Sequence, residues 1–275
     1  MSNKQLLREF EAEHILIHPE DNDRSVFYAF VLAFIFKKRY KNVKIDFILE
    51  KRYRFLRKLL YFEAGTIDTS QYYDFYISFQ KDYKAVWKYR ILEARARFGI
   101  SMPLTNKFFD NLLVNEDNPR LITEDICKIL NIEYSANIIF KQMELKPYIK
   151  RKETLFISPY NKEITSLILD KINKRNYKLI YSDNFTLEEI LTVLIYNYEK
   201  IILLNSPFDH FISFMNVKSE ILFSSINYKE HIYSKNTRIN PIKYTCSPCN
   251  VDSVFCPLKD ENKKYLCLKK GIFSF

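Results

Sequence analysis

Short apolar segments alternate with longer amphipathic ones along the chain, and this rhythm restricts the folds that the chain can adopt. In the first half we expect strands at 14–18, 43–49 and 73–79, with helices at 25–40 and 51–62 between them. Strands that alternate with helices of this kind form βαβ units, in which the strands lie parallel in one sheet. The pattern predicts an α/β fold.

A second series of the same kind begins near residue 150. The expected strands are 153–159, 177–183, 200–205 and 219–225, and the expected helices are 162–176, 186–199 and 207–216. Thr186 precedes one helix and Glu189 follows three residues later, which is the spacing of a capping box. Two such series predict two Rossmann-like domains, residues 1–148 and 149–275, with parallel sheets that face each other across a cleft.

Two further helices are expected from apolar periodicity. Residues 82–99 predict a helix that ends at Gly99, a residue suited to a C-terminal cap. Residues 123–132 predict a helix with Thr123 as its N-cap.

The charge of the chain is strongly basic, with a formal net charge of +10. Residues 37–58 hold ten Lys or Arg and two acids, interleaved with aromatic residues. This composition is typical of a solvated helix face beside a strand, and it also suits an anionic membrane surface or a polyanion. No apolar run approaches the roughly 20 residues that span a bilayer, and the start lacks a secretion-type core. We therefore expect a cytoplasmic protein, with contact to the inner membrane surface as a further possibility.

Four of the five cysteines lie in the last 30 residues, with the spacing C-x2-C-x6-C-x10-C. They are Cys246, Cys249, Cys256 and Cys267. In a reducing compartment, clustered thiols of this spacing indicate a closed structural site for zinc or iron, and unrelated free thiols are the alternative. The fifth, Cys127, falls on an expected helix and is predicted to be a core residue.

Polar residues follow the expected strand at 200–205. Asn205 and Ser206 come at its carboxyl end, and His210 lies in the first turn of the next helix. Backbone N–H groups at a helix N-terminus attract phosphate, so His210 and Ser206 are candidates to hold an anion. The alternative is that Ser206 only caps the helix and His210 only packs.

The first strand is also followed by chemically active residues. His18, Glu20, Asp21 and Asp23 cluster where this strand ends, and a carboxylate here could act as a general base toward a hydroxyl. The alternative is a solvated acidic loop in which Asp23 or Ser25 caps the next helix. No glycine-rich phosphate loop occurs, which argues against a dinucleotide fingerprint or a P-loop.

The order of elements, the segment NSPFDHF at 205–211 and the terminal CSPC…C…C pattern resemble glycosyltransferase family 9, the heptosyltransferase-like enzymes. In the first half, the segment that begins HILIH is similar to the family's first strand, helix and second strand, and residues 72–100 follow its next strand, helix and strand. The resemblance implies a GT-B fold in which the C-terminal domain holds a nucleotide sugar. It also implies transfer without a metal ion, and an iron-binding cysteine finger of the kind that some members carry.

The resemblance also suggests roles for individual residues. Asp23 would be the catalytic base, and the donor diphosphate would be held by Lys162, Asn205, Ser206 and His210. The family's Asp-Thr-Gly-x-x-His is replaced by Asn205-Ser206-Pro207-Phe208-Asp209-His210, in which only the histidine is kept. Where the family has Gly-Asp, this chain has Arg24-Ser25, with Asp23 two residues early.

The predicted function is transfer of a sugar such as a heptose from a nucleotide-sugar donor to a cell-surface glycan or protein acceptor, as in lipopolysaccharide biosynthesis. The acceptor would bind the N-terminal half, near Lys81 and Trp87. The alternative is a catalytically degenerate relative that acts as a binding or assembly subunit. A nucleic-acid-binding protein with a zinc knuckle is disfavoured by the extended α/β pattern, so nucleic acid is not an expected partner.

Overall fold

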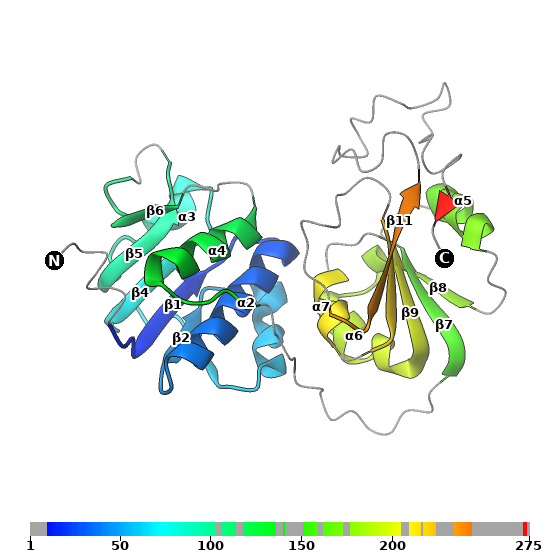
Figure 1. The fold of residues 1–275 in the computed structure, drawn as a ribbon, viewed down its shortest axis with the longest axis horizontal. Coiled ribbons are helices and arrows are strands. Elements are labelled where there is room, and N and C mark those ends of the chain that lie inside the picture. The colour runs from blue at the N-terminus through cyan, green and yellow to red at the C-terminus, as the bar shows by residue number, and fades with distance from the viewer. Residues whose placement is uncertain are drawn as a thin grey trace. The chain divides into compact units, whose positions relative to one another are not determined.

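The computed structural model describes residues 10–102, 106–113, 118–135, 140, 151–158, 162–172, 177–204, 209–215, 217–223, 234–243 and 272–273. Contacts divide the chain into two compact units, Met1–Lys141 and Gln142–Phe275 (Figure 1). The predicted boundary between residues 148 and 149 lies outside the described residues. Each unit is built around its own sheet.

The first unit contains a six-stranded sheet in the order β3-β2-β1-β4-β5-β6, with every pair parallel. The strands are β1 (His14–His18), β2 (Lys44–Phe47), β3 (Ala64–Thr66), β4 (Tyr73–Ser78), β5 (Ala94–Ile100) and β6 (Asn111–Leu113). The chain adds β2 and β3 on one side of β1 and then returns to add β4, β5 and β6 on the other. The order therefore reverses between β1 and β4, which is where ligands bind in open sheets of this kind.

Helix α2 (Asp23–Arg39) is buried along most of its length, as its apolar sequence predicts. It begins at Asp23 because the side chain of Asn22 accepts a hydrogen bond from the Ser25 backbone N–H at 2.8 Å. Asn22 is therefore the cap, rather than Asp23 or Ser25. Helix α2 packs against α4 (Pro119–Leu130), beside the sheet (Figure 1).

The predicted helix at 82–99 is wrong beyond its first turns. Helix α3 covers only Tyr83–Lys88, and Ala94–Ile100 forms β5, the strand that the family resemblance implied. In β5 the partly exposed Arg95 and Arg97 alternate with the buried Ala96 and Phe98, which is the period of a strand. Gly99 is not a helix cap, because it lies inside β5 against the ring of Phe109.

The predicted N-cap of the next helix is also wrong. Helix α4 begins four residues earlier, where Asn118 caps it by accepting from the Arg120 backbone N–H at 3.0 Å. Thr123 lies inside the helix, and its hydroxyl donates to the carbonyl of Pro119 at 2.8 Å. The helix ends at Asn131, whose φ of 54° is the left-handed conformation of many helix ends.

The second unit contains a six-stranded sheet in the order β12-β11-β10-β9-β7-β8. Its strands are β7 (Arg151–Ser158), β8 (Tyr177–Tyr181), β9 (Tyr198–Leu204), β10 (Ser219–Phe223), β11 (Thr237–Lys243) and β12 (Ile272–Phe273). All pairs are parallel except β11 with β12, which is antiparallel. The strands β7, β8 and β9 and the helix α5 (Lys162–Ile172) occur close to their predicted positions.

The helix predicted at 186–199 is shorter than expected. Helix α6 covers Leu187–Thr192, and a 3-10 turn at Leu194–Asn197 leads into β9. The predicted capping box is confirmed, because Glu189 N–H donates to the Thr186 hydroxyl and the Glu189 carboxylate accepts from Thr186 N–H.

A polar cluster crosses the middle of the second sheet. Glu220 on β10 is fully buried, and its carboxylate accepts hydrogen bonds from Lys200 on β9 and Asn240 on β11. A buried carboxylate is tolerated only when it is paired and hydrogen-bonded. These three side chains therefore tie together three neighbouring strands.

Candidate functional site

A pocket of about 630 Å³ lies in the first unit, at the carboxyl ends of its strands. It is lined by His18 at the end of β1, Phe47 at the end of β2, Thr66 at the end of β3, and Gln80 just beyond β4. The reversal of strand order between β1 and β4 falls within it. The pocket therefore occupies the position at which an open parallel sheet binds ligands.

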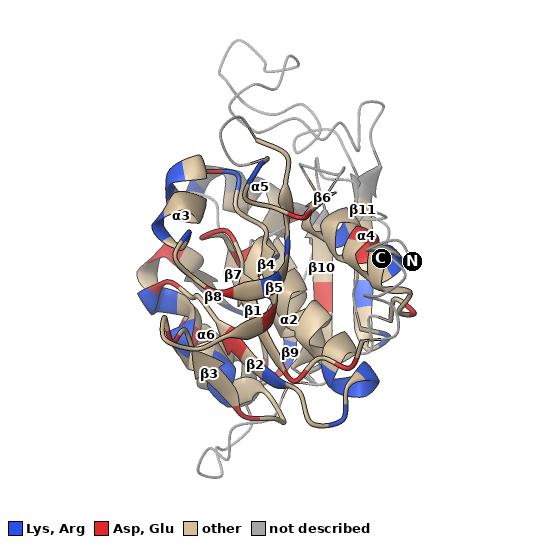
Figure 2. Cartoon of the chain, turned by 90° about the vertical axis from the view of Figure 1, so that its left-hand side faces the viewer, with Lys and Arg blue, Asp and Glu red and all other residues tan. Residues whose placement is uncertain are grey.

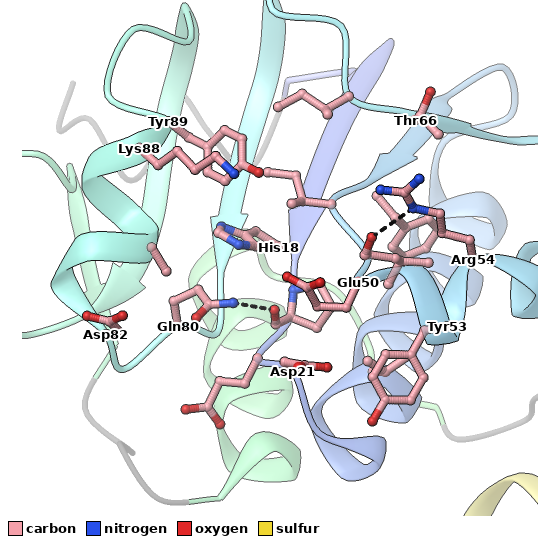
Figure 3. Close-up of a pocket in the computed structure, with 18 of the residues that line it drawn as sticks. His18, Asp21, Glu50, Tyr53, Arg54, Thr66, Gln80, Asp82, Lys88 and Tyr89 are labelled. Carbon is pink, nitrogen blue, oxygen red and sulfur yellow. Dashed lines mark hydrogen bonds between the residues drawn. The ribbon is translucent and has the colours of Figure 1, made fainter. Parts of the chain in front are cut away.

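His18 lies at the centre of this pocket (Figure 3). Its ring is buried, its Nδ1 shares a hydrogen bond of 2.9 Å with the hydroxyl of Tyr76, and the ring of Tyr89 meets it edge-on at 5.0 Å. Burial, together with the nearby charge of Lys88, lowers the pKa of His18 to about 3. His18 is therefore neutral at physiological pH and can position a ligand by hydrogen bonding, but it cannot supply a positive charge.

Positive charge comes from two sides of the pocket. Arg54 and Arg57 belong to the 3-10 helix η1 (Lys51–Leu59), and Lys88 ends α3 (Figure 3). Arg54 and Arg57 are three residues apart and therefore share one face of this 3-10 helix, while Leu56 and Leu59 share another face and are buried. Two arginines and a lysine around one cavity suit an anionic group on a ligand.

Carboxylates line the same pocket. Glu20 accepts from the Asn22 side chain at 3.1 Å, and Asp21 accepts from Arg52 at 3.0 Å. Glu50 flanks the start of η1, and Asp82 caps α3 by accepting from the Lys84 backbone N–H at 2.9 Å. The carboxylates that line the pocket are therefore Glu20, Asp21, Glu50 and Asp82. A cavity with both carboxylates and cations fits a polar ligand that carries hydroxyl groups and an anionic group.

Asp23, the predicted base, lies next to this pocket rather than among its lining residues. It is the first residue of α2 and is half-buried. Burial and the adjacent charge of Asp23 raise the pKa of Tyr53, which does line the pocket. The structure thus brings His18, Glu20 and Asp21 together as predicted, and it places Asp23 beside Tyr53.

The predicted donor residues belong to the second unit. Lys162 begins α5 just after β7 and is exposed, and His210 lies in α7 (Asp209–Phe214) just after β9. Strands β7 and β9 are neighbours, with Ile157 paired to Leu203, so both residues follow the same edge of the sheet. Asn205 and Ser206 lie outside the described residues.

His210 is only 3% exposed, and its Nδ1 lies 2.6 Å from a carboxylate oxygen of the buried Asp209. His210 is thus buried beside Asp209, as the alternative of a packing role for His210 expects. The residues at 205–208, which precede α7, lie outside the described part of the chain.

The predicted metal ligands Cys246, Cys249, Cys256 and Cys267 lie outside the described residues. Within the described ranges, no group of three or more His, Cys, Asp or Glu side chains could hold a metal ion. Cys127 is buried in α4, and burial raises the pKa of its thiol to about 12, which makes it an unreactive core residue as predicted.

Several lining residues were not anticipated from the sequence. Lys88 and Tyr89 were hidden inside the expected helix at 82–99, and Gln80, which follows the expected strand at 73–79, was not singled out. The alternation of arginine with Ala96 and Phe98 is the signal that could have revealed β5 and, with it, the loop and short helix beside the pocket.

No family model matches this sequence, and no curated protein matches it. Solved structures do match. One is a heptosyltransferase of E. coli, WaaC, with ADP: it is 10% identical, the match covers 84% of this chain and 93% of that one, and the TM-score is 0.61. Another is a family 9 glycosyltransferase from Veillonella parvula, also 10% identical, covering 84% and 87%, with a TM-score of 0.66.

The chain has the fold of the family 9 glycosyltransferases. A third match is TibC of enterotoxigenic E. coli, described as a dodecameric iron-containing heptosyltransferase in complex with ADP-D-β-D-heptose. It is 12% identical, covers 94% of this chain and 73% of that one, and has a TM-score of 0.56. The predicted α/β, GT-B-like class with two Rossmann-like sheets is thereby confirmed. At these identities the likeness establishes the fold, and the cleft between the sheets stays a prediction.

Proposed function

We propose that this protein is a glycosyltransferase that moves a sugar such as a heptose from a nucleotide-sugar donor to a cell-surface glycan or protein. The observation that carries the proposal is the likeness of most of the chain to solved heptosyltransferases, over about nine tenths of WaaC. Because fold alone does not determine activity, the proposed chemistry rests on the side chains of the first-unit pocket and on those that follow β7 and β9 in the second unit.

The first-unit pocket is the proposed acceptor site. Its volume falls within the range of roughly 300–1,000 Å³ that is usual for small-molecule sites. Arg54, Arg57 and Lys88 would bind an anionic group of the acceptor, and Gln80 and neutral His18 would bind its hydroxyls. This assignment agrees with the expectation that the acceptor binds the N-terminal half near Trp87, since Lys88 is its neighbour.

The proposed donor site is the edge of the second sheet, where Lys162 and His210 follow β7 and β9. Together with Asn205 and Ser206, they would hold the donor diphosphate. The matched structures are described with ADP and with ADP-D-β-D-heptose, which makes an ADP-linked heptose the first donor to test.

The reaction would be a single displacement. A carboxylate takes the proton of an acceptor hydroxyl, the oxygen forms a bond to the anomeric carbon, and the bond from that carbon to the phosphate oxygen breaks. Lys162 and His210 would stabilise the negative charge that grows on the departing nucleoside diphosphate. Asp23 remains the proposed base. Glu20 and Asp21, which line the pocket, are the next candidates for this role.

The four terminal cysteines are proposed to hold a structural zinc or iron ion, and TibC is described as iron-containing. Four thiolates close a tetrahedral site and leave no open position, so the ion would take no part in transfer. Metal analysis of the purified protein tests this proposal, and a near-zero metal content with the four terminal thiols freely titratable would refute it.

The alternative is a binding or assembly subunit that has lost turnover. It is favoured by the replacement of Asp-Thr-Gly by Asn205-Ser206-Pro207 and by the burial of His210. Contact between residues 37–58 and the inner membrane, and a cytoplasmic location, stay predictions. In the described part of the chain, no helix combines the length and apolarity needed to cross a bilayer.

The decisive test is release of ADP from ADP-D-β-D-heptose in the presence of extracted envelope glycans and proteins. We expect Asp23→Asn to abolish release while ADP binding persists. Unchanged release would eliminate Asp23 as the base, and Glu20→Gln and Asp21→Asn would then be measured in the same way. ADP binding without release in the unsubstituted protein would support the alternative.

A further inference from the structure

Three large apolar side chains are exposed around α3, in the first unit. Tyr83 is 44% exposed, Trp87 is 48% exposed, and Ile91 is 66% exposed. Tyr83 and Trp87 are four residues apart on a helix and therefore share one face. The turn that follows α3 carries Ile91 and is held by a hydrogen bond from the Arg90 backbone N–H to the Trp87 carbonyl at 3.2 Å. Val86, in the same helix, is fully buried and anchors α3 to the unit.

Cations surround these side chains. Residues 81–93 contain Lys81, Lys84, Lys88 and Arg90, with Asp82 and Glu93 as the acids, and Figure 2 shows basic residues at α3. The guanidinium of Arg90 lies 5.4 Å from the centre of the Trp87 ring. Asp82 is occupied in capping the helix. The surface formed by Tyr83, Lys84, Trp87, Arg90 and Ile91, called here the α3 surface, is thus both apolar and positively charged.

This combination has a specific physical meaning. Trp and Tyr prefer the level of the head groups in a bilayer, aliphatic side chains enter the acyl region, and basic residues are attracted to anionic lipids. Protein interfaces, in contrast, are depleted in lysine at their centre. Here Trp87 at the end of α3 and Ile91 in the turn after it are both exposed, and basic side chains lie between them in sequence.

The basic segment 37–58 offers no such combination. Its four aromatic residues are buried, so they cannot enter a bilayer; they are Tyr40, Phe47, Tyr53 and Phe55. Exposed aromatic and basic side chains coincide at α3 instead.

We propose that the α3 surface docks on an anionic lipid bilayer. Asp82, Ala85 and Lys88 of the same segment line the 630 Å³ pocket, so a bilayer on the α3 surface would lie beside that pocket. A lipid-linked acceptor could then present its head group to the pocket, and this last consequence alone rests on the proposed transferase function.

The chain contains a single tryptophan, Trp87, and its fluorescence therefore reports directly on the α3 surface. The experiment mixes the full chain with vesicles of phosphatidylcholine, with and without phosphatidylglycerol, at low and high salt. With anionic vesicles at low salt, we expect the Trp87 emission to shift to shorter wavelength and to be quenched by brominated lipids. Neutral vesicles or high salt should abolish both changes.

Three results would overturn the proposal. Vesicle binding with unchanged Trp87 emission would place the contact on another face, and absence of binding to anionic vesicles at low salt would exclude a lipid partner. Equal binding to neutral vesicles would refute the charge argument. None of these readouts depends on transfer activity, so a failed transferase assay leaves the test intact.

Substitutions in vesicle sedimentation provide the second arm. We expect Lys84→Ala to lower vesicle binding about fivefold, the worth of one basic residue at an anionic surface. Ile91→Ser should lower it about tenfold, because burial of an isoleucine side chain contributes at least that much. The matched control is Tyr61→Ala: Tyr61 is 62% exposed and follows the basic segment, and its loss should leave binding unchanged. An effect of Tyr61→Ala as large as that of Ile91→Ser would refute the assignment to α3.

Discussion

Gly99 provides the sharpest test of how the first sheet supports the pocket. Its backbone lies in β5. A β-carbon built on Gly99 would lie less than 3.0 Å from three ring carbons of Phe109, which is closer than real β-carbons approach other atoms. Phe109 is buried and meets Phe108 edge-on at 5.2 Å. Phe108 in turn lies 5.9 Å from Tyr76, whose hydroxyl holds His18. A methyl group at Gly99 must therefore displace a confined ring that reaches the pocket through two aromatic neighbours.

Overpacking of this kind costs about 1–3 kcal/mol. We expect Gly99→Ala to lower the free energy of unfolding by about 2 kcal/mol, measured by urea denaturation of the purified chain. The double variant Gly99→Ala with Phe109→Leu makes room for the methyl group, and we expect it to recover part of the loss relative to Phe109→Leu alone. If Gly99→Ala is neutral, or if the two losses simply add, the close contact between Gly99 and Phe109 does not exist.

The remaining predictions concern charge and the two proposed sites. His18 stays neutral in the folded state down to about pH 3 but titrates near its ordinary pKa of 6.5 in the unfolded chain, so stability should be complete above pH 6.5 and fall by about 1.4 kcal/mol by pH 5.5. His18→Gln should flatten that part of a urea-denaturation profile, and an unchanged slope would contradict the burial of the ring. Lys200→Met leaves the buried Glu220 without its cation and should cost about 3 kcal/mol, whereas a loss near zero would show that the pair is solvated. Arg57→Ala should raise the KM for the acceptor with little change in the KM for the donor, and the opposite pattern would remove the pocket as the acceptor site.

The architecture follows from local patterns wherever strand and helix periods are clean. The residues at 15–17 are all apolar because β1 is central, and the helix from Asp23 is apolar on nearly all sides because it is buried. Thr186 and Glu189 predict their own capping box because that interaction depends only on neighbours in sequence. The antiparallel β12 and the three-residue strands β3 and β6 carry too few residues to show a period.

The errors arise where distant contacts override local preference. Residues 82–99 favour a helix by composition, but β5 forms because Phe98 packs edge-on against Phe75 at 5.6 Å and Gly99 admits Phe109. The candidate site shows the same division. His18, Glu20 and Asp21 could be found because they lie at or just after the end of β1, whereas Lys88 joins the pocket through the order of strands in the sheet, which the sequence does not encode locally.

The central claim is that the second unit binds a nucleotide-sugar donor, and calorimetric titration of the purified chain with ADP, GDP and UDP tests it most directly. We predict saturable binding of at least one of these nucleotides, weakened by Lys162→Ala. Lys178→Ala, which removes an exposed lysine from β8 of the same unit, should leave binding unchanged. If none of the three nucleotides binds at millimolar concentration, the chain shares the fold of these transferases without their donor site.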